Sequence, residues 1–213
     1  MFDLCLITAE LPADALLARA TQALQHVPTG RVALQLRGRH LAEPDLRALA
    51  HDLRALTRAH GAALLINGSL ELALEVGADG VQLPERGPSP LQARERLPDA
   101  LIGASRHDLL GVQEAGGTGA SFAVLSPVFG VPDKGEPLGV ARFAAIARAS
   151  TLPLIALGGL TAERVPEVVA SGAHGVAVIR EVFASNDPER AVALLLAAVD
   201  AGRRARSSAS GGG

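Results

Sequence analysis

The sequence predicts an α/β protein with a single domain, a (β/α)8 TIM barrel. Two observations support this prediction. Short apolar runs of strand length alternate with longer helical patterns, and eight such pairs fit into 213 residues. The hydrophobic content of 48% and the mean hydropathy of +0.27 allow a large buried core. Strands that alternate with helices form parallel sheets, and this number of pairs in a short chain favours a closed barrel over an open sheet.

The strands are expected at the apolar runs that glycine, proline or polar residues interrupt. These runs cover residues 2–8, 31–36, 62–66, 79–83, 101–105, 121–125, 153–157 and 174–179. Helical patterns follow each run, at residues 13–25, 43–59, 69–76, 90–97, 108–117, 140–149, 161–170 and 188–204. The barrel domain is therefore expected to span residues 1–202, and the low-complexity segment 203–213 is predicted to be a disordered tail.

A short pattern recurs at three of the predicted helix ends. It reads Gly77-Ala-Asp-Gly-Val81, Gly119-Ala-Ser-Phe-Ala123 and Gly172-Ala-His-Gly-Val176. In each, a glycine suits the left-handed position that ends a helix, and a strand follows at once. Thr161 and Asp187 are expected to cap the helices that they precede.

Composition excludes several classes of protein. The net charge is −2, the pI is about 6.3, and tryptophan is absent, so neither a basic surface nor stacking aromatics indicate nucleic-acid binding. No apolar run reaches the roughly 18 residues that cross a membrane. No basic segment precedes the first apolar run, which argues against a signal peptide. Cys5 is the only cysteine, so no internal disulfide forms, and a reducing cytoplasm is the expected location.

Polar residues follow the second predicted strand. In barrels of this kind the chemistry lies where the strands end. Gln35, Arg37 and Arg39 stand at this place, and strand alternation puts Gln35 and Arg37 on the same side. Polar groups at the inner mouth of a barrel need partners. An anionic ligand would supply one, and an ion pair between strands is the alternative.

The third and fifth strands also end in polar residues. Asn67 either binds a ligand or caps the next helix. Ser105 ends the fifth strand, and His107 follows it. An imidazole titrates near neutrality, so His107 is a candidate general base. The neighbouring Asp108 resembles an N-cap, and a histidine beside a cap is often simply exposed.

The last three strands suggest an anion site. Lys134 is the only lysine, and it lies in the Gly/Pro-rich loop 130–139 after the sixth strand, where it can neutralise a phosphate or remain a solvated loop residue. The seventh run ends in Gly158-Gly159, and the eighth ends at Ile179-Arg180. In (β/α)8 barrels the loops at these two places often bind phosphate through backbone N–H groups.

These residues fall, in order, into motifs that resemble those of the thiamine-phosphate synthase/TenI superfamily, and the resemblance spans residues 2–200. Among its members, the sequence is most similar to the TenI-like domain that is fused to Nudix hydrolases, which implies a functional link to such an enzyme. Gln35-Leu-Arg37 resembles Q-L-R-x-K, Asn67 to Leu83 resembles N-D-R…G-A-D-G-V-H-L-G-Q, Ile102-Gly-Ala-Ser105 with His107 resembles G-x-S-x-H, Ser126-Pro-Val-Phe129 with Lys134 resembles G-P-V-F-x-T-x-T-K, and Ala156 to Leu160 with Gly172 to Val178 resembles A-I-G-G-I with G-A-D-G-V-A-V.

The resemblance implies a reaction. Family enzymes join hydroxymethylpyrimidine diphosphate to thiazole phosphate and release diphosphate, with Mg²⁺ bridging the diphosphate. The thiazole phosphate is then expected on Gly158, Gly159, Ile179 and Arg180. The pyrimidine diphosphate is expected on Gln35, Arg37, Asn67, Ser105 and Lys134.

The sequence departs from the family pattern at several positions. Gly68 and Gly87 stand where the family has metal-binding aspartates, so Mg²⁺ is only a weakly supported cofactor and no metal ligand is assigned. Arg39 replaces the lysine of the first motif. Pro127 replaces the histidine proposed to be catalytic in the TenI branch, which leaves His107 as the candidate for proton transfer. Other acids could substitute as ligands only with a changed geometry: Glu85, Asp108 and Asp133.

Three functional hypotheses follow. The first is a thiamine-phosphate synthase in which Arg37 and Lys134 stabilise the diphosphate. The second is a thiazole tautomerase that uses His107. The third is a non-catalytic module that binds thiazole or thiamine phosphates. The predicted partners are small-molecule phosphates, without nucleic acid or membrane, and a homo-oligomer is a further hypothesis.

Overall fold

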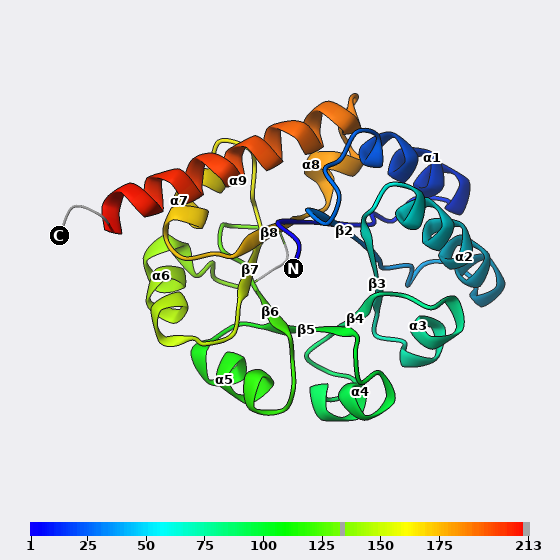
Figure 1. Cartoon of the computed structure of the whole chain (residues 1–213), viewed down its shortest axis with the longest axis horizontal. Helices are drawn as coiled ribbons and strands as arrows, with labels where there is room; N and C mark the ends of the chain where they lie inside the picture. Colours follow the sequence, from blue (N-terminus) through cyan, green and yellow to red (C-terminus); the bar gives the residue numbers. More distant parts are fainter. Residues whose placement is uncertain (133–134, 211–213) are drawn as a thin grey trace.

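The structure is a computed structural model that describes residues 1–132 and 135–210. Parallel strands form a closed barrel in which each strand pairs with the next and β1 pairs with β8. The helices surround this ring, which confirms the predicted single-domain (β/α)8 barrel (Figure 1). The strands are β1 (Leu4–Ile7), β2 (Val32–Leu36), β3 (Ala63–Asn67), β4 (Gly80–Leu83), β5 (Leu101–Arg106), β6 (Phe122–Leu125), β7 (Leu154–Leu157) and β8 (Gly175–Val178).

The helices lie where the 3.6-residue periodicity predicts them, except in the last part of the chain. A one-turn helix, α8, follows β8 and is too short to show periodicity. Helix α7 starts at Val165, after a turn over residues 162–164. Its N-cap position is taken by Arg164 and not by Thr161. The helices are α1 (Ala13–Leu24), α2 (Glu43–Ala59), α3 (Leu70–Val76), α4 (Pro90–Arg96), α5 (Leu109–Gly117), α6 (Gly139–Ala149), α7 (Val165–Ala170), α8 (Arg180–Phe183) and α9 (Pro188–Ser210).

None of the helices in the described ranges has both the length and the apolar character needed to cross a membrane. Several helices have a side-chain N-cap. Ser69 accepts the N–H of Leu72 at the start of α3, and Asp187 accepts the N–H of Arg190 at the start of α9. The predicted cap at Asp187 is thereby confirmed.

Inward-facing side chains fill the interior of the barrel. At the end where the strands begin, the rings of Phe2 and Phe122 meet edge to face, with centroids 5.2 Å apart. These two rings pack at the floor of the barrel, and the interior above them is a packed core, as in other barrels of this fold. The buried members of this inner cluster are Phe2, Cys5, Ile7, Ala33, Leu65, Phe122, Val124, Ile155 and Ala177.

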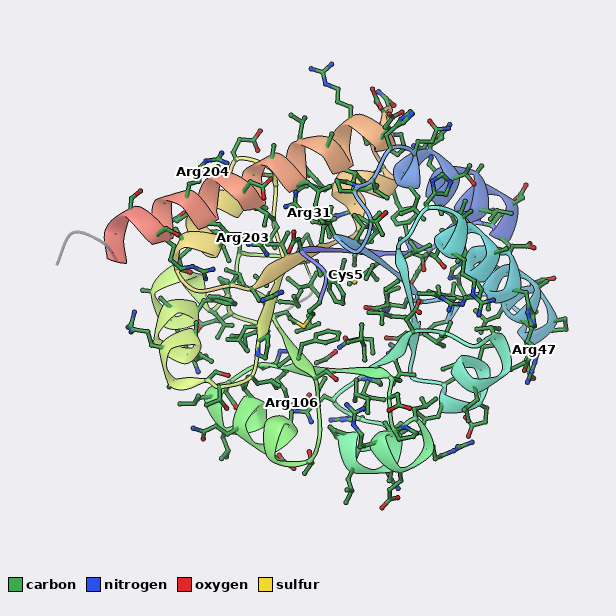
Figure 2. All side chains as sticks on the ribbon, viewed as in Figure 1. Cys5, Arg31, Arg47, Arg106, Arg203 and Arg204 are labelled. Carbon is green, nitrogen blue, oxygen red and sulfur yellow. The ribbon has the colours of Figure 1, made fainter. Side chains whose placement is uncertain are left out.

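A charged cluster ties α9 to the floor of the barrel. Asp3 is 7% exposed, and it accepts hydrogen bonds from Arg31 Nε at 2.5 Å and from Arg203 on α9. Arg31 also pairs with Asp200. Figure 2 shows Arg31 and Arg203 between α9 and the ring of strands. Helix α9 continues past Arg203 to Ser210, where the sequence predicts a disordered tail.

Candidate active site

Polar side chains line one half of the barrel mouth, from β2 to β5. Gln35 on β2 is 3% exposed, and its Nε2 donates to Asn67 Oδ1 on β3 at 3.3 Å. Gln82 on β4 is 2% exposed, and its Nε2 donates to Ser105 Oγ on β5 at 3.0 Å. The structure therefore brings together three predicted site residues and adds Gln82 to them. Ser69 caps α3, so Asn67 is free of the capping role that was its alternative.

The other half of the mouth is apolar. Ile7, Leu157 and Ile179 belong to the inner cluster at the ends of β1, β7 and β8. Cys5 lies one layer deeper, inside the ring of strands (Figure 2), with its Sγ 4.0 Å from Gln35 Oε1. Burial raises the pKa of the Cys5 thiol to about 12, so it stays neutral and acts as a core residue.

Basic residues stand at the rim after β2. Thr8 Oγ1 accepts the N–H of Arg37 at 2.8 Å, which holds the backbone at the end of β2 against β1. The Arg37 guanidinium is half-buried, and its Nη1 lies 3.8 Å from a carboxylate oxygen of the exposed Glu10. This contact is long, so Arg37 remains able to exchange it for an anionic ligand. Arg39 is exposed on the following loop.

The turn after β7 accepts only glycine. Gly158 has φ +108° and Gly159 has φ +61°, both in the range that favours glycine. A Cβ at Gly158 would lie 2.8 Å from Pro127, and one at Gly159 would lie 2.8 Å from Phe129. The turn therefore packs backbone to backbone against the segment after β6, and Phe129 N–H donates to the Gly158 carbonyl at 3.0 Å.

Arg164, which the sequence reasoning misses, braces this turn. Its Nη1 donates to the Gly159 carbonyl at 2.8 Å, and its guanidinium lies 4.8 Å from the centroid of the Phe129 ring. A lone arginine after a Gly-Gly turn is the only signal of this brace in the sequence. The contact joins the turn after β7 to the turn after β6.

Ile179 and Arg180 follow β8, the neighbour of β7 in the barrel. Ile179 is half-buried at the mouth, and Arg180 is exposed as the first residue of α8. The two residues thus lie at the strand end adjacent to Gly158-Gly159, as the predicted phosphate subsite requires.

His107 lies at the rim after β5. Its Nδ1 is 2.5 Å from the Ser126 carbonyl, and its Nε2 is 3.8 Å from an oxygen of Glu85. A carbonyl only accepts, so Nδ1 carries the hydrogen, and in the neutral ring Nε2 keeps its lone pair. Asp108 caps α5 by accepting the N–H of Gly111, as its sequence position suggests.

The carboxylates that a Mg²⁺ site needs are not assembled among the described residues. No group of three or more His, Cys, Asp or Glu side chains in residues 1–132 and 135–210 is placed to hold a metal ion. At Gly68, where the resemblance implies an aspartate, a Cβ would have no atom nearer than Pro84 Cδ at 3.8 Å. The donor set here therefore does not fit Mg²⁺. Lys134 and Asp133 lie outside the described residues.

A closed (β/α)8 barrel with a half-polar mouth and a glycine turn after β7 is typical of phosphate-binding barrels. The model of the thiamine monophosphate synthase family matches residues 4–182. A protein of Geobacter sulfurreducens is 44% identical over 167 residues, which cover 76% of this chain and 78% of that protein. The chain belongs to the thiamine monophosphate synthase family.

Further relatives agree. A thiamine-phosphate synthase of Methanoculleus marisnigri is 38% identical over 162 residues, which cover 74% of this chain and 77% of that enzyme. Among solved structures, a thiamine phosphate pyrophosphorylase from Pyrococcus furiosus superposes with a TM-score of 0.84 and 28% sequence identity, over 94% of this chain and 96% of that one. The family resemblance that the motifs suggest is therefore confirmed.

Proposed function

We propose that this chain condenses hydroxymethylpyrimidine diphosphate with thiazole phosphate to give thiamine phosphate and diphosphate. The observation that supports this proposal best is the composition of the mouth. Hydrogen-bonding side chains from β2 to β5 face an apolar half and a glycine turn from β7 and β8, in a chain of this family. A flat heterocycle suits the apolar half, and a phosphate suits the glycine turn.

The reaction needs little proton transfer. The C–O bond between the pyrimidine methylene and the diphosphate breaks, and its electron pair leaves with the diphosphate. The thiazole nitrogen gives its lone pair to the methylene carbon, which forms the C–N bond. The chain must therefore orient two substrates and stabilise the charge on the leaving group.

Each predicted site residue except His107 has a role in this scheme. Asn67 and Ser105 would bind the pyrimidine and its bridging oxygen, and Gln35 would orient Asn67. Arg37, with Arg39 and Lys134 at the rim, would stabilise the departing diphosphate. Gly158, Gly159, Ile179 and Arg180 would hold the thiazole phosphate. The residues present do not fit Mg²⁺, so no step is assigned to the metal.

A tautomerase is the second candidate. The contact between His107 Nδ1 and the Ser126 carbonyl leaves Nε2 as an acceptor at the rim. A base in this position could move a proton on a thiazole carboxylate. Glu85, 3.8 Å from Nε2, would stabilise the imidazolium that forms.

One set of assays separates the hypotheses. The protein is incubated with both substrates, with Mg²⁺ and separately with EDTA, and thiamine phosphate is quantified. The synthase hypothesis predicts that the wild type forms thiamine phosphate. It also predicts that Ser105→Ala lowers product formation about tenfold or more, whereas the exposed Ser207→Ala does not. Tight thiazole-phosphate binding without product contradicts it. In that case, tautomerisation that is lost in His107→Ala supports the second candidate, and its absence from the wild type leaves a binding module.

On the motifs alone we also propose a functional link to a Nudix hydrolase and a homo-oligomeric state. Sedimentation of the purified chain tests the second point, and a monomer at micromolar concentration would contradict it.

A further inference from the structure

Two buried glutamines hydrogen-bond to the residues at the rim of the polar half of the mouth. Gln35 is level with Leu65 and reaches up to Asn67, two residues further along β3. Gln82 is level with Gly103 and reaches up to Ser105, two residues further along β5. The same interaction between neighbouring strands thus occurs twice, from β2 to β3 and from β4 to β5.

Gly103 makes room for the second of these interactions, from Gln82 to Ser105. A Cβ at this position would lie 2.2 Å from Gln82 Oε1 and 2.4 Å from the Phe122 ring. The glutamine side chain therefore lies across β5 over a bare glycine. Its Oε1 is buried and has no hydrogen-bond partner among the described residues, so its desolvation is not compensated. An unpaired buried oxygen is consistent with a role for the other end of the amide, the Nε2 group that donates to Ser105.

The direction of these hydrogen bonds fixes what the mouth offers to a ligand. Asn67 Oδ1 accepts from Gln35, so the Asn67 amide group is left to donate. Ser105 Oγ accepts from Gln82, so the Ser105 hydroxyl hydrogen is left to donate. Both groups at the rim are therefore donors, and Arg37 beside them is a donor as well.

The described acids nearest to the rim have other partners. Glu85 lies against His107 and Glu10 faces Arg37, with side chains that are 62% and 65% exposed. The Asp108 carboxylate caps α5. An array of donors without assembled carboxylates recognises an anion directly, whereas a cation-bridged anion needs carboxylate ligands.

We propose that this mouth binds the diphosphate group by direct hydrogen bonds, without a bridging metal ion, and that Gln35 and Gln82 are positioning residues that orient Asn67 and Ser105 as donors. This inference rests on the proposed function for the identity of the anion. It goes further because it assigns a role to Gln82 and a metal-independent mode of binding.

The test uses inorganic diphosphate as the probe and the whole chain, with calorimetric titration in EDTA and in Mg²⁺. Binding in EDTA that is at least as tight as in Mg²⁺ is the expected result. Gln82→Leu should weaken it about tenfold, because Ser105 is no longer held, and Gln113→Leu on the exposed face of α5 should leave it unchanged. Diphosphate binding that is detected only with Mg²⁺ would overturn the proposal. The proposal would also be overturned if Gln82→Leu had the thermal midpoint of the wild type and bound diphosphate as tightly as the wild type does.

Two variants at Gly68 test the proposal even if Gln82→Leu does not fold. The space at Gly68 is open, and Asn and Asp tolerate its positive φ better than other residues do. Gly68→Asp should make diphosphate binding depend on Mg²⁺, whereas Gly68→Asn, with the same shape and no charge, should not. Mg²⁺ dependence in both variants and in the wild type would contradict the proposal. Because binding is measured without turnover, failure of the synthase assay leaves this result interpretable.

Discussion

The charged cluster at the barrel floor is expected to be a main source of stability, and Asp3→Asn tests it. Asp3 accepts hydrogen bonds from both Arg31 and Arg203 and thereby joins β1 to the segment before β2 and to α9. Its side chain is 10% exposed, and those of Arg31 and Arg203 are 28% and 33% exposed. The substitution keeps the shape and removes the charge.

The magnitude follows from these exposures. Breaking a fully buried ion pair costs about 3–5 kcal/mol, and a surface pair is worth about 0.2–1 kcal/mol. The Asp3 pairs lie between these limits, and Arg31 keeps Asp200 as a partner. We expect Asp3→Asn to lower the free energy of unfolding by about 2–3 kcal/mol, measured by urea denaturation at pH 7. Asp200→Asn, which removes one partly exposed pair, should cost less than about 1 kcal/mol.

The pH dependence gives a second check. Burial alone would raise the pKa of the Asp3 carboxyl, but hydrogen bonds from Arg203 and Arg31 outweigh it and hold the pKa below its ordinary value of 3.8. The stabilisation is therefore complete above pH 3.8 and is lost as the pH falls below this value. The difference between wild type and Asp3→Asn should be constant near neutrality and should shrink in acid. Equal urea midpoints at pH 7, or a larger loss in Asp200→Asn, would refute the reasoning.

Three further predictions concern other parts of the barrel. Gly158→Ala should raise the KM for thiazole phosphate and lower stability by about 1–3 kcal/mol, because its Cβ would meet the segment after β6 at 2.8 Å, whereas Gly130→Ala, with open space around it, should do neither. Gly202→Ala should lower the thermal midpoint, since its Cβ would lie 2.6 Å from two atoms of α7, while Gly117→Ala should keep or raise it; the opposite order in calorimetry would contradict this packing. Burial, and then the charge of the nearby arginine on α9, lower the pKa of His174 from 6.5, so urea midpoints should fall as the pH drops below 6.5 in the wild type but less in His174→Asn.

Much of the fold could be predicted because its signals are local. Each strand lies inside its predicted run or exceeds it by one residue, since apolar β-branched and leucine-rich runs are bounded by glycine or polar residues. The one-turn helix α8 has no period to detect. The last turns of α9 lie beyond the contact of Arg203 with Asp3. These two residues are far apart in the chain, and local composition does not encode such a contact.

The site was predictable only in part, because local patterns show which residues face the mouth but not which distant residues they contact. Alternation along β2 points Gln35 inward, and the structure joins it to Asn67. The same alternation in Gly80-Val-Gln-Leu83 could have identified Gln82, because the apolar residues on either side of it face the helices. Arg164 had no such signal, since its contacts with the turns after β6 and β7 arise only from the tertiary structure.

The two halves of the mouth are constrained by different forces, and this difference bears on the departure from the family's motifs at Gly68. At Gly158 and Gly159 a Cβ would lie 2.8 Å from Pro127 and from Phe129, so the glycine turn cannot change without moving the segment after β6. On the polar side, Gly68 has open space around it and the hydrogen bonds connect side chains only. A substitution at Gly68 alters which groups the mouth presents at little cost to folding. The ligand chemistry of this half can therefore diverge while the barrel and the glycine turn stay the same, and the direct test of that divergence is whether diphosphate binds to the wild type without metal.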